Sequence, residues 1–135
     1  MFVLRQLEFG LFDFTLHAEY DPAKGAQVMP TLYAIKDKVA VVPSPKWARF
    51  PHAFSHIFAG GYAAGYYSYL WADVLAADAY SRFSEEGIFN RQTGQSFLDN
   101  ILSRGGSEEP MALFERFRGR KPELDAMLKS YGIHG

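Results

Sequence analysis

The chain contains no cysteine. This excludes disulfide bonds and thiolate-ligated metal sites, and it fits a cytoplasmic protein, because disulfides are rare in that compartment. Charge of one sign is not in excess either, since 14 basic and 15 acidic side chains give a formal net charge of −1. This balance provides no electrostatic reason to expect nucleic acid or an anionic membrane as a partner. We therefore expect a cytoplasmic protein that binds neither.

Long hydrophobic runs and strand-like patterns are also scarce. No apolar run approaches the ~20 residues that a helix needs to cross a bilayer. Alternation of apolar and polar residues is rare, and residues 39–42 (VAVV) are the only strand candidate. The composition, with 48% hydrophobic and 21% charged residues, is that of a globular protein. The 135 residues suffice for one ordinary domain with its own core.

The periodicity that is present is helical. Leu4, Leu7, Leu11 and Phe14 are spaced to share one helix face, which predicts a helix from residue 2 to about residue 17 or 20. Nothing before Phe2 could cap its first amides, which suggests that the chain belongs to something longer. Further helices are expected over residues 26–40, 62–83, 93–106, 107–119 and 121–132. With no repeats and no internal boundary, residues 1–135 are predicted to form one all-α segment, an irregular multi-helix bundle.

The expected helix ends rest on individual residues. Thr93 and Ser107 are predicted N-caps, and Gly87 is predicted to end the helix over residues 62–83. Three prolines between residues 43 and 51 predict an ordered loop in which Trp47 and Phe50 are buried.

Aromatic residues are abundant, at 16% of the chain, and Tyr62, Tyr66 and Tyr69 are four and then three residues apart. On a helix these three would form one stripe within roughly 60°, with Tyr67 to its side. They are either half-buried packing residues whose hydroxyls reach water, or a phenol-lined wall. The preceding Gly60-Gly61 would make such a wall mobile, and its hydroxyls could donate to an oxygen that develops charge during a reaction.

The histidines give a weaker signal. His52 and His56 have the i, i+4 spacing with which two imidazoles on one helix bind zinc, but a zincin also needs Glu directly after the first His, where this chain has Ala53. An autonomous metalloenzyme would further need a third ligand and a base. We expect a structural role for His52 and a hydrogen-bonding role for His56. We assign no role to His17, and we expect the terminal His134 to be disordered.

Residues 54–83, FSHIFAGGYAAGYYSYLWADVLAADAYSRF, resemble the thimet-oligopeptidase-like zinc metallopeptidases, in particular their bacterial members. Residues 5–21, 87–120 and 124–133 resemble the same family, so the likeness covers nearly the whole chain. The stretch from His56 to Tyr69 is highly specific to it. The resemblance implies an almost entirely helical fold with two lobes around a deep channel for short peptides, of which this chain would be the C-terminal part.

The family's zinc sits on an HExxH helix, with a further Glu ligand on a following helix. Nothing in these 135 residues matches that motif. The resemblance therefore implies that the zinc ligands of the full-length enzyme lie upstream, that this fragment holds no metal, and that it is inactive alone. Its partners would be short peptide substrates and the upstream catalytic part of the same polypeptide.

Three catalytic candidates carry over by position. Tyr69 and Tyr62 match tyrosines that contact the substrate or stabilise the tetrahedral oxyanion. His56 resembles a loop histidine near the scissile carbonyl, although in eukaryotic relatives the spacing from this His to the double Gly is one residue shorter.

Four substrate-binding candidates carry over as well. Gly60 and Gly61 match a flexible glycine-rich loop that closes over bound peptide. Tyr66 and Tyr67 match further tyrosines that line the channel.

Two interpretations therefore remain. The chain is either the C-terminal portion of a zinc metalloendopeptidase that hydrolyses short oligopeptides, or a stand-alone, non-catalytic helical peptide-binding module. The presence or absence of HExxH earlier in the same polypeptide distinguishes them. In isolation, aromatic surface that would otherwise pack on the upstream lobe is expected to be exposed and to favour self-association.

Overall fold

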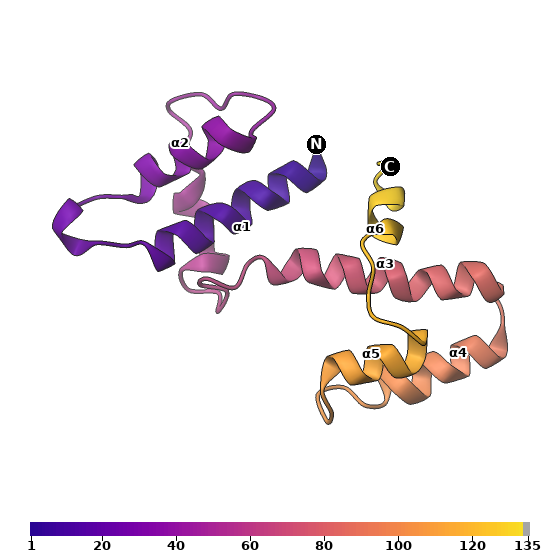
Figure 1. Cartoon of the computed structure of the whole chain (residues 1–135). Coiled ribbons are helices and arrows are strands. Elements are labelled where there is room, and N and C mark those ends of the chain that lie inside the picture. The colour runs from indigo at the N-terminus through magenta and orange to yellow at the C-terminus, as the bar shows by residue number, and fades with distance from the viewer. Residues whose placement is uncertain (134–135) are drawn as a thin grey trace. The chain divides into compact units, whose positions relative to one another are not determined.

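A computed structural model describes residues 1–133, which form helices, turns and loops without a β-strand (Figure 1). The all-α prediction is confirmed, and the strand candidate at residues 39–42 instead ends a helix and enters a loop. His134 lies outside the described residues. The chain divides into two compact units, Met1–Leu70 and Trp71–Gly135. No proline-, glycine- or serine-rich linker marks the boundary, which falls near the start of a helix.

Two helices that pack against each other dominate the first unit (Figure 1). Its elements are α1 (Phe2–Ala18), the 3₁₀ turn η1 (Pro22–Lys24), α2 (Val28–Val39), and the 3₁₀ turns η2 (Phe50–Ala53) and η3 (Ser55–Ile57). The buried core of the unit consists of Phe9, Phe12, Leu16, Leu32, Phe54 and Ile57. The core thus joins α1 and α2 to the segment that carries His56.

The predicted helix at residues 2–17 is present, but its apolar stripe is not the buried face. Leu4, Leu7, Leu11 and Phe14 are 38–52% exposed. The buried face carries two carboxylates as well as apolar residues: Glu8, Phe9, Gly10, Phe12, Asp13 and Leu16. Both carboxylates are paired, because Glu8 lies 3.4 Å from Lys36 Nζ and Asp13 accepts hydrogen bonds from a distant loop. Those partners are far away in the sequence, which is why spacing alone selected the other face.

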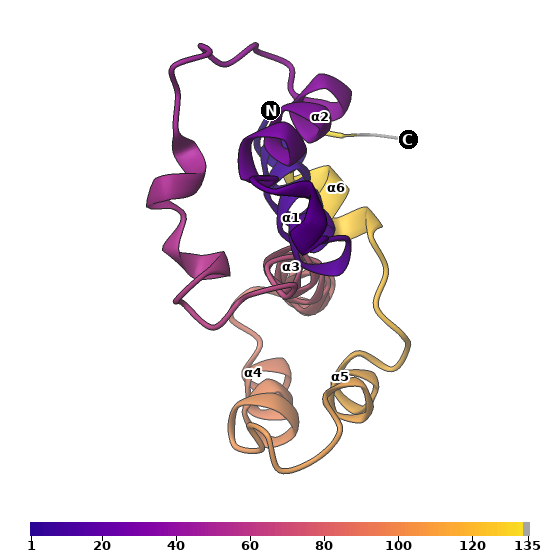
Figure 2. The same cartoon turned by 90° about the vertical axis from the view of Figure 1, so that its left-hand side faces the viewer.

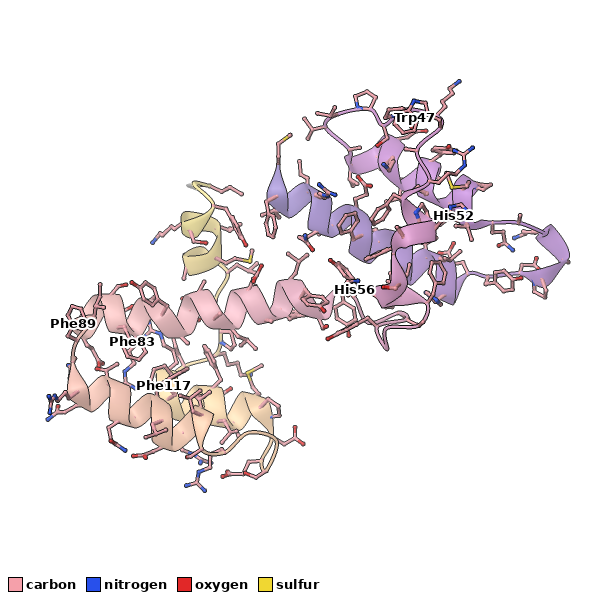
Figure 3. All side chains as sticks on the ribbon, turned by 180° about the vertical axis from the view of Figure 1, so that it is seen from behind. Trp47, His52, His56, Phe83, Phe89 and Phe117 are labelled. Carbon is pink, nitrogen blue, oxygen red and sulfur yellow. The ribbon has the colours of Figure 1, made fainter. Side chains whose placement is uncertain are left out.

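The proline-rich loop after α2 confirms one predicted burial and contradicts the other. Phe50 is partly buried and stacks on Phe9, with ring centroids 4.7 Å apart. Trp47 is 78% exposed, so its predicted burial is wrong (Figure 3). The loop joins α2 to η2 and places Phe50, rather than Trp47, against the core.

The helix predicted over residues 62–83 begins later than expected. The helix α3 spans Ser68–Glu86 and ends before Gly87, as predicted, with Gly87 at a φ of 107°. Residues 63–67 form turns, and Ala64 has a φ of 54°, which an α-helix does not permit. Of the three tyrosines assigned to a helical stripe, only Tyr69 lies on α3, so the stripe is wrong as a description of the backbone.

The second unit is built around α3 (Figure 2). Its other elements are α4 (Arg91–Phe97), the π-helical turn η4 (Leu98–Leu102), α5 (Pro110–Arg118) and α6 (Asp125–Ser130). The segments η4 and α5 pack against each other, and Figure 2 shows α4 and α5 as the two sides of a helical hairpin. Phe117 packs against Phe97 at 5.2 Å and Phe83 at 6.1 Å (Figure 3), which ties the hairpin to α3.

Both N-cap predictions in this unit are wrong. The cap of α4 is Asn90, whose side chain accepts hydrogen bonds from the amides of Gln92 and Thr93. Thr93 is fully buried and donates its hydroxyl to Glu86 instead. The helix α5 begins only at Pro110, a residue suited to the first helical position because it has no N–H to satisfy. Ser107 therefore precedes the helix.

A buried ion-pair network holds α3 to the end of α5 and to the chain that follows it. Asp78 is fully buried, and its carboxylate accepts two hydrogen bonds of 2.7 Å from Arg120 and one of 3.2 Å from Arg118. The backbone amide of Glu123 donates another at 2.8 Å. Burial raises the pKa of Asp78, but the hydrogen bonds from Arg120, the Glu123 amide and Arg118 outweigh it and lower the pKa. No local pattern of residues indicated this network.

Candidate functional site

Four of the predicted site residues lie together in the first unit as a ring cluster, which consists of His56, Tyr62, Tyr66 and Tyr69. The ring of Tyr69 is 5.0 Å from that of Tyr62 and 4.9 Å from that of Tyr66, measured between centroids. The imidazole of His56 lies 5.9–6.2 Å from all three. The predicted proximity of these side chains is therefore present, although turns rather than one helix produce it.

The double glycine brings the loop back onto His56. The Gly60 amide donates to the Ser55 carbonyl at 2.8 Å, and the Tyr62 amide donates to the His56 carbonyl at 3.0 Å. A Cβ on Gly60 would lie 2.7 Å from the Cα of His56, closer than real side chains approach. Gly61 has a φ of 80°, in the region that glycine adopts without strain. These glycines thus set a tight turn, while the mobility expected of them stays a prediction.

We predict that Gly60→Ala destabilises the chain by about 1–3 kcal/mol, because the added methyl must displace the backbone of His56. Gly65→Ala is the matched control, since a Cβ there would make ordinary contacts at 3.5 Å or more. Urea unfolding of both variants measures the difference. Equal stability of the two would contradict the close approach at Gly60.

The hydroxyls of Tyr62 and Tyr69 form a donor pair. A hydrogen bond with Tyr62 raises the pKa of Tyr69, and burial and the nearby Tyr66 raise it further. Tyr69 therefore stays protonated at neutral and mildly alkaline pH. Each of the two phenols carries one O–H donor. This pair can donate to an oxygen that carries negative charge.

Tyr66 is held differently from its neighbours. Its hydroxyl donates to Gln6 Oε1 at 3.2 Å, and its ring packs edge-on against Phe54 and Phe9. Burial raises the pKa of Tyr66, and the charge of Arg5 partly opposes this. Tyr66 thus supports the ring of Tyr69 with its own hydroxyl already engaged.

Tyr67 lies outside the ring cluster, to the side as predicted. It is 47% exposed, and its ring packs edge-on against Phe14 at 6.1 Å. Its role in substrate binding stays a prediction.

The residue that sequence reasoning missed is Asp13. This fully buried side chain accepts hydrogen bonds from the amides of Ala64 and Tyr66, and it lies 2.9 Å from His17 Nδ1. The signal in the sequence was an acid between Phe12 and Phe14 in an apolar helix, where an unpaired carboxylate would be costly.

The described residues do not form a metal centre: residues 1–133 contain no group of three or more His, Asp or Glu side chains placed to hold an ion. His52 and His56 lie on the separate turns η2 and η3, so they do not share a helix face (Figure 3). The ring of His52 approaches the Arg49 carbonyl at 3.3 Å, whereas His56 belongs to the ring cluster.

One hollow of the first unit is lined by none of the four residues of the ring cluster. It has a volume of about 590 Å³ and is lined by the start of α1 and by the loop after α2. None of the seven predicted site residues lines it. The candidate site is therefore defined by the contacts among its side chains and not by this hollow.

The chain belongs to peptidase family M3, because residues 1–133 match the model of that family. This confirms the resemblance to zinc metallopeptidases of the thimet-oligopeptidase type. Over all 135 residues the chain is 80% identical to oligopeptidase A of Salmonella typhimurium and to that of Escherichia coli. It is 69% identical to oligopeptidase A of Haemophilus influenzae over 133 residues, which is 98% of the chain. The chain spans about a fifth of the length of each of these relatives. No helix in residues 1–133 has the length and apolar character to cross a membrane.

Proposed function

We propose that this chain supplies part of the peptide-binding and catalytic surface of an M3 metallopeptidase that hydrolyses short oligopeptides. The observation that carries the proposal is the ring cluster, in which the imidazole of His56 lies within 6.2 Å of three phenol rings, and the ring of Tyr69 lies within 5.0 Å of the other two. The 80% identity to two proteins named oligopeptidase A, along the entire chain, supports the same substrate class.

The chemistry follows from the donors. Hydrolysis of an amide passes through a tetrahedral intermediate whose former carbonyl oxygen is negatively charged, and donors placed around that oxygen lower the barrier. Tyr69 and Tyr62 would donate to it from their hydroxyls. His56 would contact the substrate near the same carbonyl. One such donor contributes ~3–4 kcal/mol to the stability of the transition state.

The remaining residues would shape the surface that meets the peptide. Tyr66 would hold the ring of Tyr69 in place through their 4.9 Å contact. Gly60 and Gly61 would set the turn that brings Tyr62 to His56 and would close over bound peptide. Tyr67 would line the channel further from the reacting bond.

Family M3 implies zinc, which supplies Lewis-acid chemistry at the scissile bond. The described residues do not offer a ligand set that fits the ion. We propose that the ligands belong to the remainder of a longer polypeptide and that this chain is inactive alone. The cytoplasmic location expected from the sequence stays a prediction.

That remainder is also the proposed partner of the exposed stripe on α1. Leu4, Leu7, Leu11 and Phe14 form an apolar row of the kind that packs against another surface. About four fifths of the length of the relatives lies outside the part that this chain matches, which provides such a surface. In the isolated chain the same row would favour self-association.

A hybrid peptidase tests the proposal. In it, this chain replaces the matching fifth of the Escherichia coli oligopeptidase A. We expect the hybrid to cleave short peptides within about tenfold of the parent rate, with sensitivity to chelators. The control is the parent enzyme without this segment, which should be inactive. A folded, zinc-loaded hybrid that cleaves no peptide would contradict the proposal and favour a stand-alone binding module.

A further inference from the structure

We propose that Asp13 is a positioning residue for the tyrosines of the ring cluster. It would hold residues 62–66 in a turn, and so hold Tyr62 and Tyr66 against Tyr69. This inference rests on the proposed function, because it assigns Asp13 an effect on turnover through those tyrosines.

Both carboxylate oxygens of Asp13 are engaged by the loop. Oδ1 accepts from the Ala64 amide and Oδ2 from the Tyr66 amide, each at 2.9 Å. The side chain of Asp13 is 1% exposed, so water does not compete for these bonds. His17 Nδ1 lies 2.9 Å from Oδ1 and occupies a further side of the carboxylate. A buried carboxylate with these partners fixes two alternate amides of a loop that is about 50 residues away in the sequence.

The turn needs such an anchor because its own alanines and tyrosines do not exclude a helix. Alanine and tyrosine tolerate helical geometry, and α3 begins at Ser68, directly after the turn. Ala64 nevertheless has a φ of 54°, a conformation that residues other than glycine rarely adopt. In a helix the amides of Ala64 and Tyr66 would bond within the segment; here they bond to Asp13. Without that acceptor, the segment could join α3 and carry Tyr62 and Tyr66 away from their present positions.

A purely structural role is the competing explanation, since Asp13 also lies on the buried face of α1. The two explanations differ in whether the effect of Asp13 on turnover depends on the tyrosine hydroxyls. A residue that acts through the tyrosines loses its effect on turnover once their hydroxyls are gone, whereas a merely structural residue lowers turnover by the same factor in any background. The change in kcat caused by an Asp13 substitution, measured with and without the hydroxyls of Tyr62 and Tyr69, therefore distinguishes the two explanations.

The test uses Asp13→Asn in the hybrid peptidase, which keeps the size of the side chain and removes one acceptor. We expect kcat to fall at least tenfold while KM changes less than threefold, because the affected donors act in the transition state. In a hybrid that already carries Tyr62→Phe and Tyr69→Phe, Asp13→Asn should lower kcat less than threefold further. If Asp13→Asn lowers kcat as much in this double variant as it does in the unmodified hybrid, the proposal is overturned.

Glu8→Gln is the matched control. Glu8 is also a buried carboxylate of α1, but its partner is Lys36 at 3.4 Å, on α2. The same change from carboxylate to amide should leave kcat within twofold. If Glu8→Gln lowers kcat as much as Asp13→Asn does, the effect belongs to α1 in general and the proposal fails.

Hydrogen exchange keeps the proposal testable should Asp13→Asn fail to fold. In the unmodified hybrid, the amides of Ala64 and Tyr66 should exchange at least tenfold more slowly than the neighbouring turn amide of Ala63. Rapid exchange at Ala64 and Tyr66 would overturn the anchor directly. Normal turnover after Tyr69→Phe would instead overturn the proposed function, so the two failures are distinguishable.

Discussion

Replacing Tyr69 with Phe in the hybrid peptidase is expected to lower kcat by about 10²–10³-fold, the usual effect of removing one donor to an oxyanion. The change deletes the Tyr69 hydroxyl and leaves the ring in contact with Tyr66. KM should change little, because the missing bond is strong only when the substrate oxygen carries negative charge. Steady-state kinetics on a short peptide measure both constants.

Tyr80→Phe is the matched control for that experiment. Tyr80 lies on the same helix, is 56% exposed, and belongs to neither the ring cluster nor the proposed wall. Its loss of a hydroxyl should leave kcat unchanged. If Tyr69→Phe turns over at the normal rate, Tyr69 does not stabilise the oxyanion.

Asp78→Asn is expected to destabilise the chain by about 3–5 kcal/mol, because it removes the charge that Arg118 and Arg120 share in a buried setting. The amide also turns a donor toward groups that are themselves donors. Urea unfolding at neutral pH measures the loss. Glu123→Gln provides the comparison: this carboxylate is 60% exposed and 3.5 Å from Arg120, so its loss should cost at most about 1 kcal/mol.

The same carboxylate predicts a dependence on pH. The pKa of Asp78 in the folded chain is below its usual value of 3.8. A lowered folded-state pKa contributes stability that is fully present above the unfolded value and disappears as the pH falls through the folded one. The stability difference between the unmodified chain and Asp78→Asn should therefore shrink on acidification below about pH 4. A difference that stays constant into that range would contradict the assigned ion pair.

The helices that the sequence predicted well are those defined by local signals. Apolar spacing predicted α1, and Gly87 correctly marked the end of α3. The start of α3 was missed because its cause is not local. The amides of Ala64 and Tyr66 bond to Asp13, about 50 residues earlier, and no pattern within residues 62–67 records that partner.

In the candidate site, too, the sequence predicted some features and missed those that depend on a distant partner. The resemblance pointed to His56, Tyr62, Tyr66 and Tyr69, and these side chains do lie together. The cause of their proximity differs from the expected one. A common helix face was expected to bring the three tyrosines together, whereas in the structure a turn whose amides bond to Asp13 does so. The spacing of the tyrosines could be read from the sequence. The turn that brings them together could not, because it depends on hydrogen bonds to a residue far away in the chain.

The central claim is that the Tyr62–Tyr69 pair recognises the tetrahedral state rather than the substrate. Its most direct test compares the affinity of the hybrid peptidase and its Tyr69→Phe variant for two ligands: a phosphinic peptide, which is tetrahedral at the reacting position, and an uncleaved peptide of the same sequence. We expect Tyr69→Phe to weaken binding of the phosphinic peptide at least tenfold and binding of the planar peptide less than threefold. Equal losses for the two ligands would contradict the account.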